Sequence, residues 1–103
     1  MLSARAEIIF TIEGRNYSGE KYPLRPAFRF GEGLLFSGNI KSSNPMYFHN
    51  KKYLVDIDFF TIEDEGYAVI EPYLNVGMDI VMQEGSRIIG LAKLNSFIYT
   101  GSQ

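Results

Sequence analysis

The amino-acid sequence predicts an all-β domain, folded either as a sandwich or as a small barrel. Apolar and polar residues alternate with period two through most of the chain, which is typical of strands with one buried face. The apolar runs are short and closely spaced, with turn-forming residues between them. The seven tyrosines and eight phenylalanines also favour strands. We find no convincing helical period and expect at most a short helical turn near residues 41–50.

The first half of the chain is expected to supply three strands. The run "AEIIFTIE" (residues 6–13) places Ile8, Phe10 and Ile12 on one face. Turn-forming residues follow, and then come "LRPAFRF" (24–30) and "LLFSGNI" (34–40). Unless a bulge at the intervening glycines shifts the phase, these two runs share a set of inward-facing residues: Phe28, Phe30, Leu34, Phe36 and Ile40.

The second half begins with the longest irregular segment, residues 41–52. The run "YLVDIDFFTI" (53–62) alternates apolar residues with Asp56 and Asp58 and is expected to be a strand. Residues 63–66 predict a hairpin turn in which Gly66 takes a positive φ. "YAVIEPYL" (67–74) then predicts a further strand, which Pro72 confines to an edge or a bulge.

The chain ends in two apolar runs, residues 76–82 and 87–99, that flank the polar residues Gln83–Arg87. We expect a hairpin here, closing the chain around its first strand. Gly85 would supply the positive φ that the turn requires. Gly90 would let a neighbouring strand or side chain approach closely.

The composition predicts an ordinary globular protein, with residues 1–103 as a single domain. A net charge of −2 provides no overall basic field to attract nucleic acid or anionic lipid. The absence of cysteine excludes disulfides and a cysteine nucleophile and favours a cytoplasmic location. No apolar run approaches the roughly 18 residues of a membrane helix, so we expect no membrane association.

Motifs that carry chemistry are weak, and we expect no enzyme activity, no cofactor and no metal site. The G-x-x-x-x-G spacing from Gly33 has Asn39 where a phosphate-binding loop requires lysine. The single histidine, His49, could serve as a general base only beside a carboxylate such as Asp56 or Asp58. A lone histidine in a loop is more often solvated.

Several blocks of the sequence resemble the C-terminal (third) β-barrel domain of elongation factor Tu and related translation GTPases. The last hairpin of that family reads approximately G-L-R-F-A-I-R-E-G-G-R-T-V-G. Residues 77–90 lie over it without a gap and keep Glu84, Gly85, Arg87 and Gly90. Gly14-Arg15 matches an earlier G-G-R turn, and "LRPAFRF" resembles the family's Y-R-P-Q-F-Y-F. The interval from Gly38 to Pro72 is longer than the family's and does not align.

This resemblance implies a closed antiparallel β-barrel of about six strands without enzyme activity. Within the intact factor the domain packs on its neighbouring domains and contacts the T-stem of aminoacyl-tRNA. The matching tRNA-facing positions would be Arg15, Asn16 and Gly85. A lysine of the family falls on Glu71, whose carboxylate would repel a phosphate. The change from a basic to an acidic residue at this position and the negative net charge of the chain disfavour binding of tRNA or RNA. We keep such binding as the alternative function.

We therefore expect a stand-alone binding module, most simply for another protein. It could mimic part of elongation factor Tu and act as an immunity or regulatory protein. Arg15 and Arg87 would meet on one rim if the first and last strands pair. Residues 44–53 interleave aromatic residues with lysines, which is typical of interaction surfaces, although Met46 and Phe48 could instead plug one end of the barrel. The candidate contact residues are Arg15, Asn16, Tyr47, Phe48, Glu84, Gly85 and Arg87.

Overall fold

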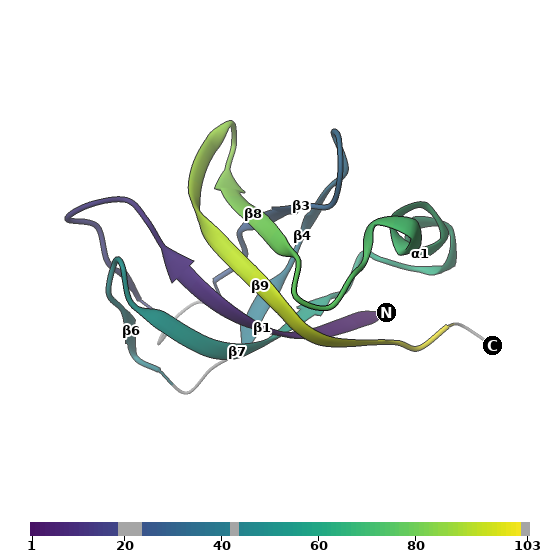
Figure 1. Ribbon diagram of the computed structural model, residues 1–103, viewed down its shortest axis with the longest axis horizontal. Coiled ribbons are helices and arrows are strands. Elements are labelled where there is room, and N and C mark those ends of the chain that lie inside the picture. Colours follow the sequence, from purple (N-terminus) through teal and green to yellow (C-terminus); the bar gives the residue numbers. More distant parts are fainter. Residues whose placement is uncertain (19–23, 42–43, 102–103) are drawn as a thin grey trace.

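The computed structural model describes residues 1–18, 24–41 and 44–101. They form a seven-stranded antiparallel sheet that nearly closes into a barrel, beside a sheet of two short strands (Figure 1). The order in the large sheet is β4-β3-β8-β9-β1-β7-β5. Its strands are β1 (Leu2–Phe10), β3 (Ala27–Arg29), β4 (Leu35–Ser37), β5 (Asn39–Lys41), β7 (Lys52–Phe59), β8 (Asp79–Glu84) and β9 (Arg87–Tyr99). The small sheet pairs β2 (Tyr17–Ser18) with β6 (Met46–Tyr47).

The barrel nearly closes because its two edge strands are consecutive in the chain. Only Gly38 separates β4 from β5, and its amide donates to the carbonyl of Pro26 at 3.1 Å. A Cβ atom at Gly38 would lie 2.7 Å from the rings of Phe28 and Phe59, so this bend passes close over the core. With β4 and β5 counted as one bent strand, the seven strands of the sheet occupy six positions. The predicted small antiparallel barrel is confirmed.

β1 lies between β9 and β7 in the sheet; it pairs with β9 along its whole length and with β7 from Leu2 to Ile9. Its even-numbered residues are buried and its odd-numbered residues face outward, as the alternation predicts. Gly90 of β9 lies opposite Phe10 at the end of β1. A Cβ atom at Gly90 would lie 2.2 Å from the carbonyl oxygen of Ile9, which confirms the predicted close approach.

Aromatic side chains fill the interior of the barrel. Phe59 packs edge-on against Phe28 and Phe30, with ring centroids 5.1 and 5.3 Å apart. All three side chains are buried. Such edge-to-face pairs add to the free energy gained from burying the rings.

The prediction for residues 63–74 is wrong. In place of a hairpin turn and a strand, the chain forms helix α1 (Asp64–Ile70) and the 3-10 helix η1 (Glu71–Tyr73). Gly66 lies inside α1 without a positive φ, and Pro72 lies in the first turn of η1, where proline is tolerated. The run of eight residues is too short to separate a period of 2 from one of 3.6. The helical spacing of the buried residues Ile70 and Leu74 is the one that the barrel accepts.

The segment near residues 41–50, where a short helical turn was expected, contains β6 and a turn at Asn50, which has a φ of 61°. Residues 42 and 43 lie outside the described residues. Among the residues that the structure describes, no helix has the length and apolar character to cross a membrane.

The two ends of the barrel are covered by different elements (Figure 1). At one end, α1 and its flanking segments insert Ile62, Ile70 and Leu74 into the core. At the opposite end lie β2 and β6, whose Tyr17 and Tyr47 are buried. We call this second end the β6 end.

The α1 end contains a tyrosine with an elevated pKa. The ring of Tyr99 stacks on Tyr67, with centroids 4.0 Å apart, and its hydroxyl donates a hydrogen bond to the carboxylate of Asp64. The pKa of Tyr99 is raised to about 12, mainly because the hydroxyl loses solvent on folding and secondly because of this hydrogen bond.

Because the pKa of Tyr99 is raised on folding, its neutral form stabilises the native state. This contribution is complete below the unfolded pKa of about 10 and is lost as the pH rises through about 12. We expect urea unfolding midpoints to fall over this interval in the wild type and to fall less in Tyr99→Phe. Asp64→Asn should also reduce the dependence, since it removes the acceptor carboxylate. An equal decline in all three proteins would contradict the assignment to Tyr99.

Candidate functional site

Three segments meet at the β6 end: the turn after β1, β6 with the turn that follows it, and the β8–β9 hairpin. They meet because β1 lies between β7 and β9, so its last residues adjoin the start of both neighbours. The amide of Thr11 donates to the carbonyl of Ile89 at 2.9 Å. The amide of Asn50 donates to the carbonyl of Phe10 at 2.7 Å. The backbone itself therefore holds the three segments together.

Arg15 and Arg87 both lie near Glu84, which binds Arg15 and pairs with Arg87 across the β8–β9 hairpin. Arg15 donates to the carboxylate of Glu84 at 3.3 Å, and its guanidinium carbon lies 4.7 Å from the ring centre of Tyr17. Arg87 is close enough for its charge, like that of Arg15, to act on the Tyr17 hydroxyl. Gly85 has a φ of 57° at the tip of the hairpin, which confirms the predicted turn conformation.

Tyr17 lies beneath this charged group. Its ring stacks on Phe10 with centroids 4.3 Å apart, and only 6% of the residue is exposed. Burial is the main cause of its raised pKa; the charge of Glu84 and a hydrogen bond with its carboxylate add to the shift, whereas the charges of Arg15 and Arg87 oppose it. The hydroxyl therefore lies near the Glu84 carboxylate, although no group among the described residues meets the full geometry of a hydrogen bond with it.

The second part of the site surrounds β6. Phe48 is 46% exposed and Met46 is 37% exposed, so neither plugs the barrel. Lys51 places its ammonium 5.5 Å from the ring centre of Phe48. Asn16 accepts a hydrogen bond from the amide of His49 at 3.3 Å and so joins this part to the Arg15 turn.

Tyr47 is a core residue and does not belong to the exposed surface. It is 1% exposed, and its ring packs against Phe10 and Tyr53 with centroids 5.8 and 5.0 Å away. β6 pairs with β2 so that Tyr47 lies opposite Tyr17, and both side chains point into the barrel. Tyr47 therefore supports the site from below, while its neighbours Met46 and Phe48 face outward.

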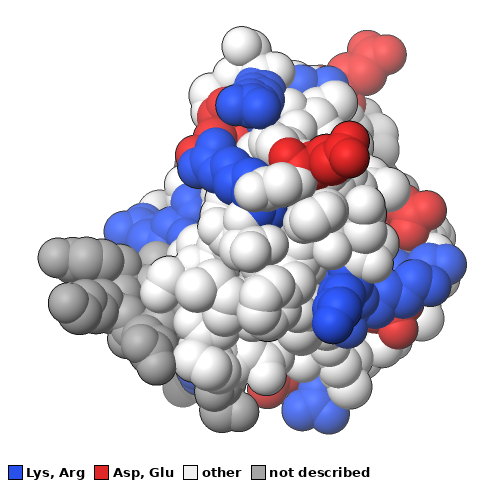
Figure 2. Space-filling model, turned by 90° about the vertical axis from the view of Figure 1, so that its left-hand side faces the viewer, with Lys and Arg blue, Asp and Glu red and all other residues white. Residues whose placement is uncertain are grey.

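Viewed toward the β6 end, the molecule has a broad uncharged surface bordered by basic and acidic side chains (Figure 2). Six of the seven predicted contact residues are exposed and belong to the three segments that meet here: Arg15, Asn16, Phe48, Glu84, Gly85 and Arg87.

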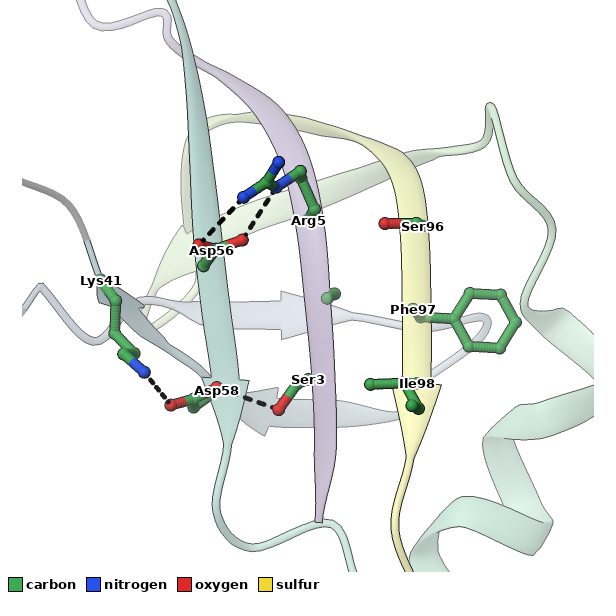
Figure 3. Close-up of a pocket in the computed structure, with 9 residues that line it drawn as sticks. Ser3, Arg5, Lys41, Asp56, Asp58, Ser96, Phe97 and Ile98 are labelled. Carbon is green, nitrogen blue, oxygen red and sulfur yellow. Dashed lines mark hydrogen bonds and ion pairs between the residues drawn. The ribbon is translucent and has the colours of Figure 1, made fainter.

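A second feature, not predicted from the sequence, is a shallow groove of about 370 Å³ on the barrel wall (Figure 3). Arg5 forms an ion pair with Asp56 at 3.0 Å, and Lys41 forms one with Asp58 at 3.1 Å. Ser3 also donates a hydrogen bond to Asp58 at 3.0 Å. The hydrogen bond from Arg5 lowers the pKa of Asp56. The basic and acidic side chains of the groove neutralise one another. We therefore interpret them as a structural network of ion pairs that joins β1, β5 and β7.

The side chains of this groove include Asp56 and Asp58, the two aspartates beside which His49 could serve as a general base. Asp56 is exposed on the outer face of β7 as the alternation predicts, and Asp58 is buried in the groove, but each already has a basic partner of its own. His49 lies in the turn at the β6 end, where its amide binds Asn16. The network could be found from the sequence only by knowing the register, which places Arg5 directly opposite Asp56.

Fold and site together define a small, nearly closed β-barrel with an aromatic and charged surface at one end. Comparison of the chain with protein-family profiles and with curated protein sequences gave no match.

Proposed function

We propose that this chain is a non-enzymatic binding module that recognises another protein through its β6 end. The observation that carries this proposal is the exposed apolar pair Met46 and Phe48, placed beside Lys51 and joined through Asn16 to the charged rim. Apolar and aromatic residues within a polar border are the usual composition of a protein interface. We place the module in the cytoplasm, which the absence of cysteine favours.

The packing of the barrel supports a surface function over an internal site. Large side chains such as Phe28, Phe30 and Phe59 occupy the interior and pack on one another. Near-closure of the sheet also leaves little strand edge for pairing with an extended peptide. Contact with a partner would then use the outer surface of the elements that cover the ends of the barrel.

The resemblance to the third domain of elongation factor Tu suggests what kind of partner to seek. A stand-alone copy of such a barrel could bind a toxin or another protein that targets the factor, as an immunity or regulatory protein would. The alternative is tRNA or RNA binding, since Arg15, Asn16 and Gly85 all lie at the β6 end. Two features favour a protein: Glu84 already neutralises Arg15, and the net charge of the chain is −2.

The test is a pull-down from bacterial lysate with the purified domain, with and without nuclease. We expect a protein partner that resists nuclease and that is lost with Phe48→Ser. The matched control is Phe60→Ser, because Phe60 is 53% exposed but follows β7 at the α1 end. Added elongation factor Tu should displace the partner if the domain mimics the factor.

Loss of every partner after nuclease treatment would favour the RNA alternative. Equal capture by the wild type and Phe48→Ser would contradict binding through the β6 end.

A further inference from the structure

We infer that the last part of β9 is a surface for self-association, where two copies of this chain pair as antiparallel strands about a two-fold axis at Ile98. This surface lies at the opposite end of β9 from the β8–β9 hairpin, so the inference goes beyond the proposed function of the β6 end. It is carried by the extent of strand pairing, by the direction of the backbone groups and by the composition of the segment.

β9 continues beyond the strand that pairs with one of its edges. β8 pairs with β9 only as far as Lys93, and the amide of Gly77 extends this contact by one residue when it donates to the carbonyl of Leu94 at 2.6 Å. On the other edge, β1 accompanies β9 as far as Tyr99. Among the described residues, segment 95–99 therefore has a neighbouring strand on the β1 side alone (Figure 3). A strand edge of this kind is a template for pairing with another chain.

The hydrogen bonds to β1 show which backbone groups of this segment point away from the barrel. The amide of Thr100 donates to the carbonyl of Met1 at 3.0 Å, so the backbone groups of Thr100 face β1. Successive residues of a strand direct these groups to opposite edges, so Ile98 also faces β1, whereas Phe97 and Tyr99 face the free edge. No described residue provides a hydrogen bond to the backbone of Phe97 or Tyr99 on that side. Each of the two residues therefore offers one donor and one acceptor.

A second copy of the same segment satisfies these groups. With Ile98 opposite its own counterpart, Phe97 of each copy lies opposite Tyr99 of the other, and each such pair exchanges two backbone hydrogen bonds. The two Ile98 residues then form a non-hydrogen-bonded pair, the position where side chains of adjacent strands come closest. Ile98 is 67% exposed on the outer face of β9, so this contact would cover an apolar side chain that now meets solvent.

The composition of the segment favours a second copy as the occupant. A two-fold axis brings each nearby side chain close to its own counterpart, so a charged residue there would face a like charge. Residues 95–101, "NSFIYTG", contain no charged residue. They also lack the lysine or proline with which edge strands usually prevent pairing. The segment is therefore compatible with its own copy in both hydrogen bonding and charge.

Analytical ultracentrifugation of the full chain, from micromolar to millimolar concentration, tests the inference. We expect a reversible equilibrium between monomer and dimer that stops at the dimer, because a two-fold axis closes the contact. Ile98→Lys should raise the dissociation constant by about tenfold or more, since it places two ammonium groups side by side. The matched control is Ile88→Lys, because Ile88 is an isoleucine of the same strand and is 53% exposed, but has β8 as its neighbour. Ile88→Lys should leave the dissociation constant unchanged.

Amide hydrogen exchange of the wild type, followed by NMR, locates the contact without any substitution. The amides of Phe97 and Tyr99 should exchange rapidly at micromolar concentration and become protected at millimolar concentration. The amide of Ile98 faces β1 and should be protected at both concentrations. The urea unfolding midpoints of Ile98→Lys and Ile88→Lys are measured alongside, so that a folding defect is recognised.

A chain that stays monomeric at millimolar concentration would overturn the inference. So would assemblies larger than a dimer, a dimer that folded Ile98→Lys forms as readily as the wild type, or a dimer in which the amides of Phe97 and Tyr99 still exchange rapidly. The pull-down separates this inference from the proposed function. Ile98→Lys should capture the protein partner as well as the wild type does, whereas Phe48→Ser should not. If Phe48→Ser captures the partner fully while Ile98→Lys prevents dimerisation, the proposed function fails and the self-association surface holds.

Discussion

Replacing Gly90 with alanine is expected to destabilise the barrel by about 3 kcal/mol or more. The new Cβ atom would lie 2.2 Å from the carbonyl oxygen of Ile9 and 2.8 Å from the terminal methyl of Met82. The methionine side chain can move, but the carbonyl belongs to the backbone of β1. Relief of the clash therefore requires β1 and β9 to separate at the position where Gly90 pairs with Phe10.

Urea unfolding followed by far-ultraviolet circular dichroism measures this effect, and Gly66→Ala provides the control. A Cβ atom at Gly66 meets only Phe36 and Ile62, at 3.6 to 3.9 Å, which is ordinary contact. Since Gly66 lies inside α1, alanine should stabilise the protein by about 0.5–1 kcal/mol. The same substitution is thus expected to have opposite signs at the two glycines. A Gly90→Ala protein as stable as the wild type would show that the two strands are not in such close contact.

Phe59→Ala should destabilise the protein by about 4 kcal/mol. The substitution removes a buried ring from its edge-to-face contacts with Phe28 and Phe30 and leaves a cavity beneath the bend at Gly38. For a domain of ordinary stability, 5–15 kcal/mol in total, this loss brings the native state close to unfolding.

The next residue along the chain supplies the matched control. Phe60 is 53% exposed, compared with 1% for Phe59, so Phe60→Ala should change the free energy of unfolding by less than about 1 kcal/mol. Thermal and urea unfolding of both variants would check the difference. Similar losses in the two proteins would mean that the core is not centred on Phe59.

Those features of the candidate site that follow from backbone conformation and strand pairing could be predicted from the sequence. Gly85 takes the positive φ that a tight hairpin turn needs, and the convergence of Arg15 with Arg87 follows once the first and last strands pair. The direction of Tyr47 was not predictable. β6 is only two residues long, too short for alternation to show which residue faces inward, and its pairing with Tyr17 decides the matter.

The all-β character of the barrel wall can be read from the order of apolar and polar residues alone. A strand with one buried face must alternate apolar and polar residues, and "AEIIFTIE" and "YLVDIDFF" do so over enough residues to be unambiguous. Tertiary structure alone decided what residues 63–74 become. Their apolar residues satisfy both a strand and a helix, and in the folded barrel it is the helical segment that buries Ile70 and, after η1, Leu74. Tertiary structure alone also brought Glu84 within reach of both Arg15 and Tyr17, because no local pattern records contacts between segments far apart in the chain.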